Sequence, residues 1–252
     1  MPRGDERSTS GVLPVVPRLT YGEDASKWVD RSDPVGESRG TVVVIHGGFW
    51  RAEYGADLGA GLARDLADRG WTALNVEYRR VGNGGGFPAT FDDIHAAINL
   101  ADGEGPVVTL GHSAGGHLAT WAAARQRFEE WAGGVEVTHV LSQAGVVDLT
   151  TAYDENLGGG AVVGLMGVGA DDPAYDLADP MRHIPLDAPV WCLHAPDDES
   201  VPISQSRDYV QAATEAGATA ELVEVTGGHF DLIDTTTDAW RTIVDLLDTI
   251  DS

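Results

Sequence analysis

Hydrophobic residues in this chain gather in short continuous runs, which are separated by longer stretches of helical character. From about residue 41 onward, the runs do not alternate with polar positions, as is typical of strands covered by helices on both faces. The alternation favours an α/β fold, a mostly parallel sheet with crossover helices. The predicted strands are 41–46, 71–78, 107–111, 139–142, 189–194 and 219–225, and the predicted helices are 56–69, 88–102, 114–127, 204–216 and 237–250.

Two regions depart from this alternation. The first forty residues show little periodicity, although residues 18–21 have the character of an edge strand. Residues 148–188 are rich in Gly and Asp and are too long for an ordinary connection within a sheet. Two interpretations of this insertion stay open: a cap over a substrate pocket, or a surface loop with short helices. No repeat or linker divides the chain, so we expect residues 1–252 to form a single domain.

The charge of the chain excludes some classes of partner. Sixteen Lys and Arg residues stand against 40 Asp and Glu residues, which gives a formal net charge of -24. Such an exterior repels phosphate backbones and anionic lipid surfaces, so we expect neither a nucleic acid nor a membrane as partner. Lys27 is the only lysine, which favours biased amino-acid usage as the origin of the acidity, with adaptation to high salt as the alternative.

Cysteine usage and the lengths of the apolar runs bear on the compartment. Cys192 is the single cysteine, so the chain cannot form an internal disulfide, and the N-terminal sequence MPRGDERSTS lacks the apolar core of a secretory signal. No apolar run approaches the roughly 20 residues that a membrane-spanning helix requires. We therefore expect a cytoplasmic protein.

A serine motif lies at the junction of a predicted strand and a predicted helix. Residues 111–115 fit the pattern G-x-S-x-G, with the apolar run PVVTL before them and a helical stretch from Ala114 onward. A sharp turn at this point holds the serine in a strained conformation, and the glycines let strand and helix approach each other. We predict Ser113 as a nucleophile and the Ala114 N–H as one donor of an oxyanion hole.

A serine nucleophile requires a general base and a carboxylate that orients the base. Three consecutive acids, at positions 197–199, follow the predicted strand 189–194, and His229 follows the predicted strand 219–225. Both loops lie at the carboxyl edge of a parallel sheet, where open α/β sheets place their sites. The order serine, acid, histidine therefore predicts a catalytic triad of Ser113, His229 and one of the three acids.

A second glycine motif directly follows the first long apolar run. The sequence HGGFW, residues 46–50, comes after TVVVI. Glycines leave the backbone N–H groups of such a loop uncovered by side chains, so that these groups can bind a carbonyl oxygen. We predict the N–H groups of Gly48 and Phe49 as further donors of the oxyanion hole.

The chain resembles α/β-hydrolases of the esterase/lipase and kynurenine formamidase (arylformamidase) branch in six motifs that occur in the expected order: HGGFW, YRR, FPATFDDIHAA, GHSAGGHLA, DDESVP and GGHFDLID. The resemblance covers roughly residues 40–250 and implies the α/β-hydrolase fold, with helices on both faces of the sheet. It also implies that Asp198 is the acid, since family loops of the form D-x-x-V-P place the acid three residues before the valine. HGGFW is similar to the H-G-G-G loop of esterases, in which the histidine braces the loop.

The resemblance leaves the substrate open, because related esterases, formamidases and peptidases share these motifs. We expect a serine hydrolase that cleaves small ester or amide bonds through an acyl-enzyme, with carboxylesterase activity first and arylformamidase activity as the close alternative. The aromatic loop is similar to that of formamidases, in which case Phe49 and Trp50 would stack near the scissile bond. A small-peptide hydrolase and a catalytically silent binding protein on the same fold are further alternatives.

Three residues beside the motifs are predicted to contact the substrate: Trp50, His112 and Phe230. For Trp50 the alternative is packing within its own loop, and for His112 it is a structural role. Cys192 and His194, within and at the end of one apolar strand, are expected to pack. No spacing of ligating residues resembles a metal site and no glycine run matches a phosphate-binding loop, so we expect neither a metal ion nor a cofactor.

Overall fold

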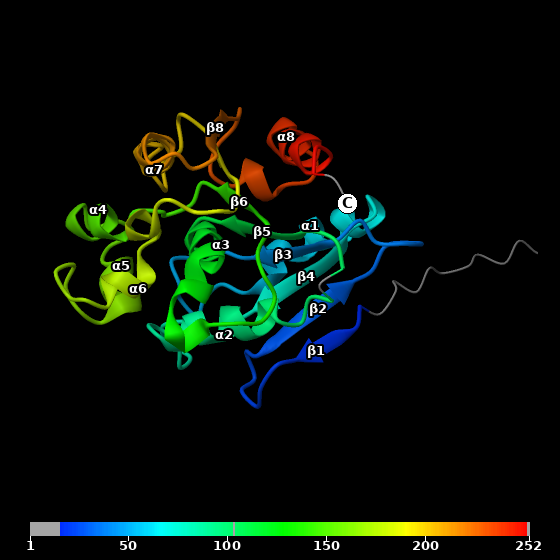
Figure 1. Cartoon of the computed structure of the whole chain (residues 1–252), viewed down its shortest axis with the longest axis horizontal. Coiled ribbons are helices and arrows are strands. Elements are labelled where there is room, and N and C mark those ends of the chain that lie inside the picture. The colour runs from blue at the N-terminus through cyan, green and yellow to red at the C-terminus, as the bar shows by residue number, and fades with distance from the viewer. Residues whose placement is uncertain (1–15, 103, 251–252) are drawn as a thin grey trace, which may run out of the picture.

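The computed structural model describes residues 16–102 and 104–250. Within this part of the chain, an eight-stranded sheet forms the middle layer, in the order β1-β2-β4-β3-β5-β6-β7-β8 (Figure 1). The first two strands pair antiparallel, and the strands from β4 to β8 along the sheet pair parallel. The strands are β1 Arg18–Thr20, β2 Trp28–Ser32, β3 Thr41–Ile45, β4 Thr72–Glu77, β5 Val107–His112, β6 His139–Gln143, β7 Val190–His194 and β8 Ala220–Glu224.

The six predicted strands are confirmed as the parallel part of the sheet, and their ends fall within one residue of the expected positions. The edge strand expected at 18–21 is confirmed as β1. Strand β2 was not predicted, because its sequence WVDRS is mostly polar and only Val29 of its residues is fully buried. Its pairing with β4 extends the sheet beyond the parallel region.

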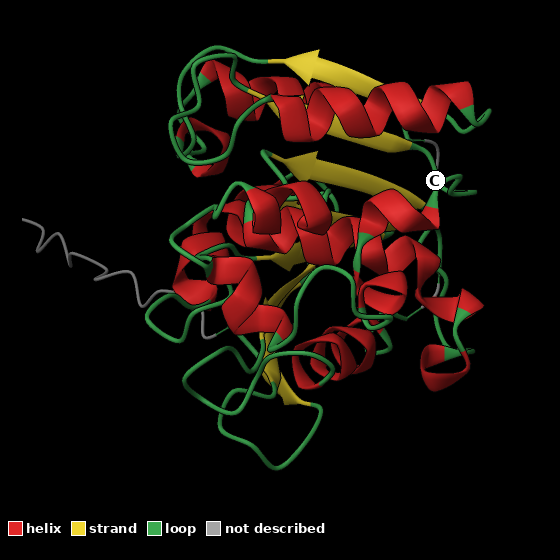
Figure 2. Cartoon of the chain, turned by 90° about the vertical axis from the view of Figure 1, so that its left-hand side faces the viewer, coloured by secondary structure: helices red, strands yellow, loops and turns green. Residues whose placement is uncertain are grey.

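Helices pack against both faces of the sheet, and several of them lie in front of the strands in Figure 2. Their buried residues place α2, α3 and α7 against one face and α1 and α8 against the other. Each lies within a predicted range. The 3-10 turn Ala56–Gly59 replaces the first turn of the range 56–69, and the 3-10 turn Arg125–Arg127 replaces the last turn of the range 114–127. Among the described residues, no helix combines the length and apolar character that crossing a lipid bilayer requires. The bounds are α1 Ala60–Asp68, α2 Ala89–Ile98, α3 Ala114–Ala124, α7 Ser204–Glu215 and α8 Asp238–Leu247.

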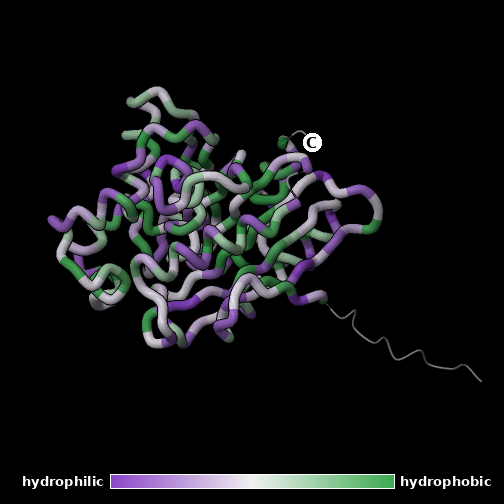
Figure 3. The backbone as a smooth tube through the Cα atoms, turned by 60° about the horizontal axis from the view of Figure 1, so that its bottom comes forward, coloured by the Kyte–Doolittle hydropathy of each residue, from purple (hydrophilic) through white to green (hydrophobic). Residues whose placement is uncertain are grey.

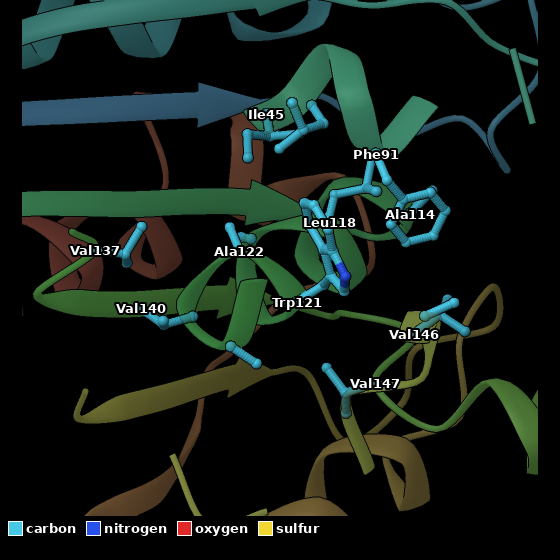
Figure 4. Close-up of a cluster of buried hydrophobic side chains, with 14 of the residues drawn as sticks. Ile45, Phe91, Ala114, Leu118, Trp121, Ala122, Val137, Val140, Val146 and Val147 are labelled. Carbon is cyan, nitrogen blue, oxygen red and sulfur yellow. The ribbon is translucent and has the colours of Figure 1, made fainter. Parts of the chain in front are cut away.

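Strand β3 shows why the central strands are apolar throughout. Val43 and Ile45 belong to the core beneath α2 and α3, whereas Val42 and Val44 belong to the core beneath α1 and α8. Successive side chains of a strand point to opposite faces, so a strand covered on both sides must be apolar at every position. Figure 4 shows Ile45 and Phe91 in the first of these cores, and Figure 3 shows green, hydrophobic stretches running through the interior.

Residues 148–188 form short helices that lie at the left of the sheet in Figure 1. Val162 and Leu165 of this segment are buried in the same core as α2 and α3. Asp148 caps the first helix by accepting a hydrogen bond from the Thr151 N–H at 2.8 Å. The segment is therefore packed onto the main body of the molecule. Its helices are α4 Leu149–Asp154, α5 Ala161–Met166, α6 Tyr175–Ala178 and the 3-10 turn Pro180–His183.

Candidate active site

Ser113 lies in a sharp turn between β5 and α3. Its backbone has φ 56° and ψ -118°, a left-handed conformation that non-glycine residues rarely adopt. The Ser113 N–H donates to the Gln143 carbonyl at 2.8 Å, and the Ser113 carbonyl accepts from the Gly116 N–H at 2.9 Å. Bonds on both sides hold the strained residue in place. Such strain concentrates at functional sites, where the surrounding structure maintains it.

The glycines of the serine motif are required by close backbone contacts. A Cβ atom at Gly111 would lie 2.0 Å from the carbonyl oxygen of Gly115, and a Cβ atom at Gly115 would lie 2.0 Å from that of Ile45. The turn therefore brings α3 directly against both β5 and β3. Only glycine allows this approach, which agrees with the steric role predicted for these positions.

The acid and the histidine predicted for the triad meet at the carboxyl edge of the sheet. His229, in the loop after β8, donates from Nδ1 to Asp198 Oδ2 at 2.6 Å. The other carboxylate oxygen accepts the N–H groups of Ser200 and Val201 at 2.8 and 2.9 Å. The Asp198 side chain is 0% exposed. This bond leaves Nε2 of the neutral ring with a free lone pair, as a general base requires.

The pKa of Asp198 reflects two opposing effects. Burial favours the neutral acid, but the nearby His194 N–H and the hydrogen bonds from His229 and from the Val201 N–H outweigh it. Together they hold the pKa of Asp198 well below its ordinary range. The carboxylate therefore stays charged throughout the neutral range, where it orients the His229 ring.

His112 joins the serine turn to the histidine loop. Its Nε2–H donates to the His229 carbonyl at 2.9 Å, and the two ring centroids lie 4.5 Å apart. Burial lowers the pKa of His112 to about 3, with the neighbouring His229 acting in the same direction. A neutral imidazole directly before Ser113 thus fixes the backbone at His229.

The loop HGGFW turns tightly beside the serine motif. Gly48, Phe49 and Trp50 have φ angles of 107°, 53° and 55°, three successive residues with positive φ. Gly47 packs on the serine turn, since a Cβ atom there would lie 2.7 Å from the His112 carbonyl oxygen and 3.0 Å from Ser113 Cβ. Among the described residues, the N–H groups of Gly48 and Phe49 form no hydrogen bond. They are free to donate to a ligand at this site.

His46 holds the start of this loop. Its Nδ1–H donates to the Gly47 carbonyl at 2.8 Å, its Nε2 accepts from Arg80 at 3.1 Å, and its ring stacks on Tyr78 with 4.4 Å between centroids. The Tyr78 hydroxyl donates to the His46 carbonyl at 2.8 Å. Burial lowers the pKa of His46 to about 3, so the ring remains neutral and keeps this arrangement.

The two arginines after β4 are both engaged in ion pairs. Arg80 pairs with Glu77, and Arg79 donates to the carboxylate of Asp93 through its side chain at 2.7 and 2.8 Å and through its backbone N–H at 2.9 Å. Lys27 lies 3.2 Å from the same carboxylate, which is 0% exposed. Asp93, on α2, thus fixes the loop that supports His46.

Replacing Asp93 with asparagine should lower the free energy of unfolding by about 2–3 kcal/mol, because it leaves the charges of Arg79 and Lys27 without their buried partner. Urea denaturation measures this loss. The matched control is Asp92→Asn on the same helix. Asp92 is exposed and accepts a hydrogen bond from Trp131, and asparagine keeps an oxygen that can accept this bond. Equal stability of the two variants would contradict a structural role for the Asp93 cluster.

Trp50 connects the glycine loop to α3 and α6. Its Nε1–H donates to His117 Nδ1 at 3.2 Å, and His117 Nε2–H donates to the Ala178 carbonyl at 2.9 Å. Burial lowers the pKa of His117 to about 3, which preserves this neutral tautomer. The chain of bonds ties the loop after β3 to the segment 148–188.

A second contact joins the same loop to this segment. Arg51 donates to the Gly158 carbonyl at 2.5 Å. A Cβ atom at Gly158 would lie 2.4 Å from a ring carbon of Phe49. Gly158, Gly159 and Gly160 have φ angles of 61°, 64° and 80°, which explains the run of three glycines. No local pattern indicates that this run contacts Phe49, because 109 positions separate Phe49 from Gly158.

The three residues predicted to contact substrate differ in exposure. Phe230 is 61% exposed, and its ring lies 5.3 Å from that of His229. Trp50 and His112 are 1% and 4% exposed, and protein groups already bind Nε1 of Trp50 and Nε2 of His112. Their placement favours the packing and structural alternatives. Within residues 16–102 and 104–250, no group of three or more His, Cys, Asp or Glu side chains is arranged to hold a metal ion.

The fold and the arrangement of motifs at its carboxyl edge define an α/β-hydrolase. The sequence pattern of the BD-FAE family matches residues 33–212, more than half of the chain, so this protein belongs to the BD-FAE family. The matched range includes Ser113 and Asp198 and ends before His229. The family predicted from the motifs is therefore confirmed at the level of the α/β-hydrolases.

Known proteins similar to this chain include esterases and a formamidase. Kynurenine formamidase avaC of Aspergillus versicolor is 26% identical over 178 residues, and the match covers 58% of this chain and 62% of that protein. A thermophilic esterase of the planctomycete Thermogutta terrifontis, Est2, has a TM-score of 0.75 at 19% identity and covers 94% of this chain and 91% of its own. That esterase has also been solved phosphonylated by sarin.

A truncated carbohydrate esterase from gut microbiota has the same fold. Its TM-score is 0.76 at 22% identity, over 92% of this chain and 94% of its own. At such low identities, the two solved structures establish the fold and leave the reaction to be argued from the site. They confirm the predicted mostly parallel sheet with helices on both faces.

Proposed function

We propose that this protein is a serine hydrolase that cleaves small carboxylic esters through an acyl-enzyme. The observation that carries the proposal is the hydrogen bond of 2.6 Å between His229 and Asp198, at the sheet edge where Ser113 occupies its strained turn. A serine, a histidine and a buried carboxylate in this order have the roles of nucleophile, base and orienting group. The esterase fold of the solved relatives supports the same reaction class.

In the proposed reaction, Ser113 Oγ bonds to the ester carbonyl carbon while its proton passes to His229 Nε2. The negative charge on the carbonyl oxygen is stabilised by the N–H groups of Ala114, Gly48 and Phe49, each worth on the order of 3 kcal/mol. His229 then protonates the leaving alcohol as the C–O bond breaks. Water attacks the acyl-enzyme with His229 again as base, which releases the acid and restores Ser113.

We assign to residues 148–188 the role of a cap that shapes the substrate pocket. The bond from Arg51 to Gly158 and the chain of bonds from Trp50 through His117 to Ala178 support this assignment, because they join the cap to the loop that carries Gly48 and Phe49. Phe230, exposed beside His229, is the residue we assign to the leaving-group side. The Phe230 ring also lies 6.0 Å from that of His112, which directly precedes the proposed nucleophile.

A fluorophosphonate probe should label Ser113 and no other residue. The probe reacts with a serine only when a base and an oxyanion hole activate it, so labelling reports the assembled site. Digestion and mass spectrometry locate the modified peptide, and Ser113→Ala is the control that must remain unlabelled. A folded wild-type protein that does not react would contradict the proposal.

Arylformamidase activity is the second candidate, and the similarity to a kynurenine formamidase favours it. Turnover of p-nitrophenyl acetate and of N-formylkynurenine separates the two. We expect the larger kcat/KM on the ester. A much larger value on the formamide would establish the second candidate in its place, and no turnover of either would remove both.

A further inference from the structure

A second histidine lies against the proposed catalytic acid. His194, the last residue of β7, is fully buried, and its Nε2 lies 3.5 Å from Asp198 Oδ2. This is the same oxygen that accepts the hydrogen bond from His229. Asp198 is therefore placed between two imidazole rings, of which only that of His229 has the role of base.

The contacts of His194 fix which ring nitrogen carries the proton. Nε2 lies 2.9 Å from the Val201 carbonyl oxygen, which can only accept, so Nε2 is the protonated nitrogen. Nδ1 then accepts from the Ser206 hydroxyl of α7 at 2.7 Å. The Nε2–H is thus directed at the Asp198 loop, with Val201 as its nearer acceptor and Asp198 Oδ2 as its further one.

We propose that His194 is a positioning residue that fixes the Asp198 loop and weakens the hold of the carboxylate on His229. The inference rests on the proposed function and deepens it. The N–H dipole of His194 partly neutralises Oδ2, and its bond to Val201 holds the turn whose N–H groups bind Oδ1. The oxygen that accepts from His229 is therefore shared with a second N–H dipole.

Other charged groups near the pair do not supply the same interaction. His112 faces His229 from β5, but it is neutral and its Nε2–H is bonded to a carbonyl. The remaining acids of the two loops are Asp197, Glu199 and Asp231, and Asp231 Oδ2 accepts the Gly228 N–H at 2.7 Å. Loss of the His194 donor should therefore strengthen the effect of the Asp198 charge on His229.

His194→Phe keeps a ring of similar size and removes both nitrogens, whereas His194→Gln keeps an amide N–H near the Nε2 position. In the phenylalanine variant, the acid limb of the kcat/KM profile should move to higher pH by about half a unit or more. The glutamine variant should restore most of the wild-type profile. An NMR titration of His229 should show the same shift independently of turnover.

His139→Phe is the matched control, a ring replacement on the neighbouring strand β6 at the end far from the site. It should leave the acid limb unchanged. A folded, probe-reactive His194→Phe with the wild-type acid limb would overturn the inference. Should this variant not fold, His194→Asn decides, because an asparagine amide ends near the Nδ1 position beside Ser206 and is too short to reach the Asp198 loop: a shift to higher pH supports the inference and an unshifted profile overturns it. Failure of the wild-type protein to react with the fluorophosphonate would instead overturn the proposed function.

Discussion

Ser113→Ala should lower kcat/KM for p-nitrophenyl acetate on the order of 10⁴-fold or more. The substitution removes the atom that forms the acyl-enzyme, and only the oxyanion donors and substrate binding remain to accelerate hydrolysis. Alanine meets the same backbone strain as serine at φ 56°, so we expect the fold to be kept. Steady-state kinetics over a range of substrate concentrations measure the loss.

Ser204→Ala, on α7, is the control for this variant, because its side chain belongs to no part of the proposed site. It should retain wild-type turnover. If Ser113→Ala were to hydrolyse the ester at a rate similar to the control, the serine mechanism would be wrong even though the fold is that of a hydrolase. Circular dichroism and thermal unfolding of both variants separate a catalytic loss from a folding defect.

Gly48→Ala should lower kcat/KM by about 10²–10³-fold, the loss typical of an oxyanion-hole donor. The Gly48 backbone has φ 107°, which disfavours any side chain, and the new Cβ would lie 2.3 Å from Cβ of Tyr54. That atom is close to the main chain and cannot swing away, so the loop itself must move. Its movement displaces the N–H groups that we assign to the oxyanion hole.

Gly36→Ala is a closely matched control, because Gly36 has φ 100° and nothing lies within 4 Å of the Cβ position. It imposes a similar backbone strain far from the proposed oxyanion donors. We expect a stability loss of about 1 kcal/mol for Gly36→Ala and no change in kcat/KM. Equal activity of the two variants would contradict the role assigned to the Gly48 loop.

Local signals in the sequence were sufficient for the parallel sheet and for the motifs at its edge. A strand buried on both faces must be apolar throughout, so the strands from β3 to β7 were visible as continuous runs. Strand β2 had no such signal, because its side chains are mostly polar and its place depends on pairing with β4. The ends of the helices were also displaced, since short 3-10 turns have no distinct periodicity.

The candidate site divides in the same way. The serine turn, the HGGFW loop and the histidine loop each depend on glycines within a few residues, and the sequence located them. The sequence left substrate contact and a packing or structural role open for Trp50 and His112, and only the structure shows that Trp50 Nε1 is bonded to His117 and His112 Nε2 to the His229 carbonyl. Such pairings join segments far apart in the chain.

The sequence by itself determined the alternation of the parallel strands with helices and the positions of the serine and histidine motifs, because these features rest on local periodicity and short-range sterics. Only the tertiary structure decided that Phe49 packs against Gly158 and that His194 lies beside Asp198 with its Nε2 proton directed at the Val201 carbonyl. The physical reason is that side-chain contacts and hydrogen-bond partners between distant segments are fixed by the packing of the whole domain.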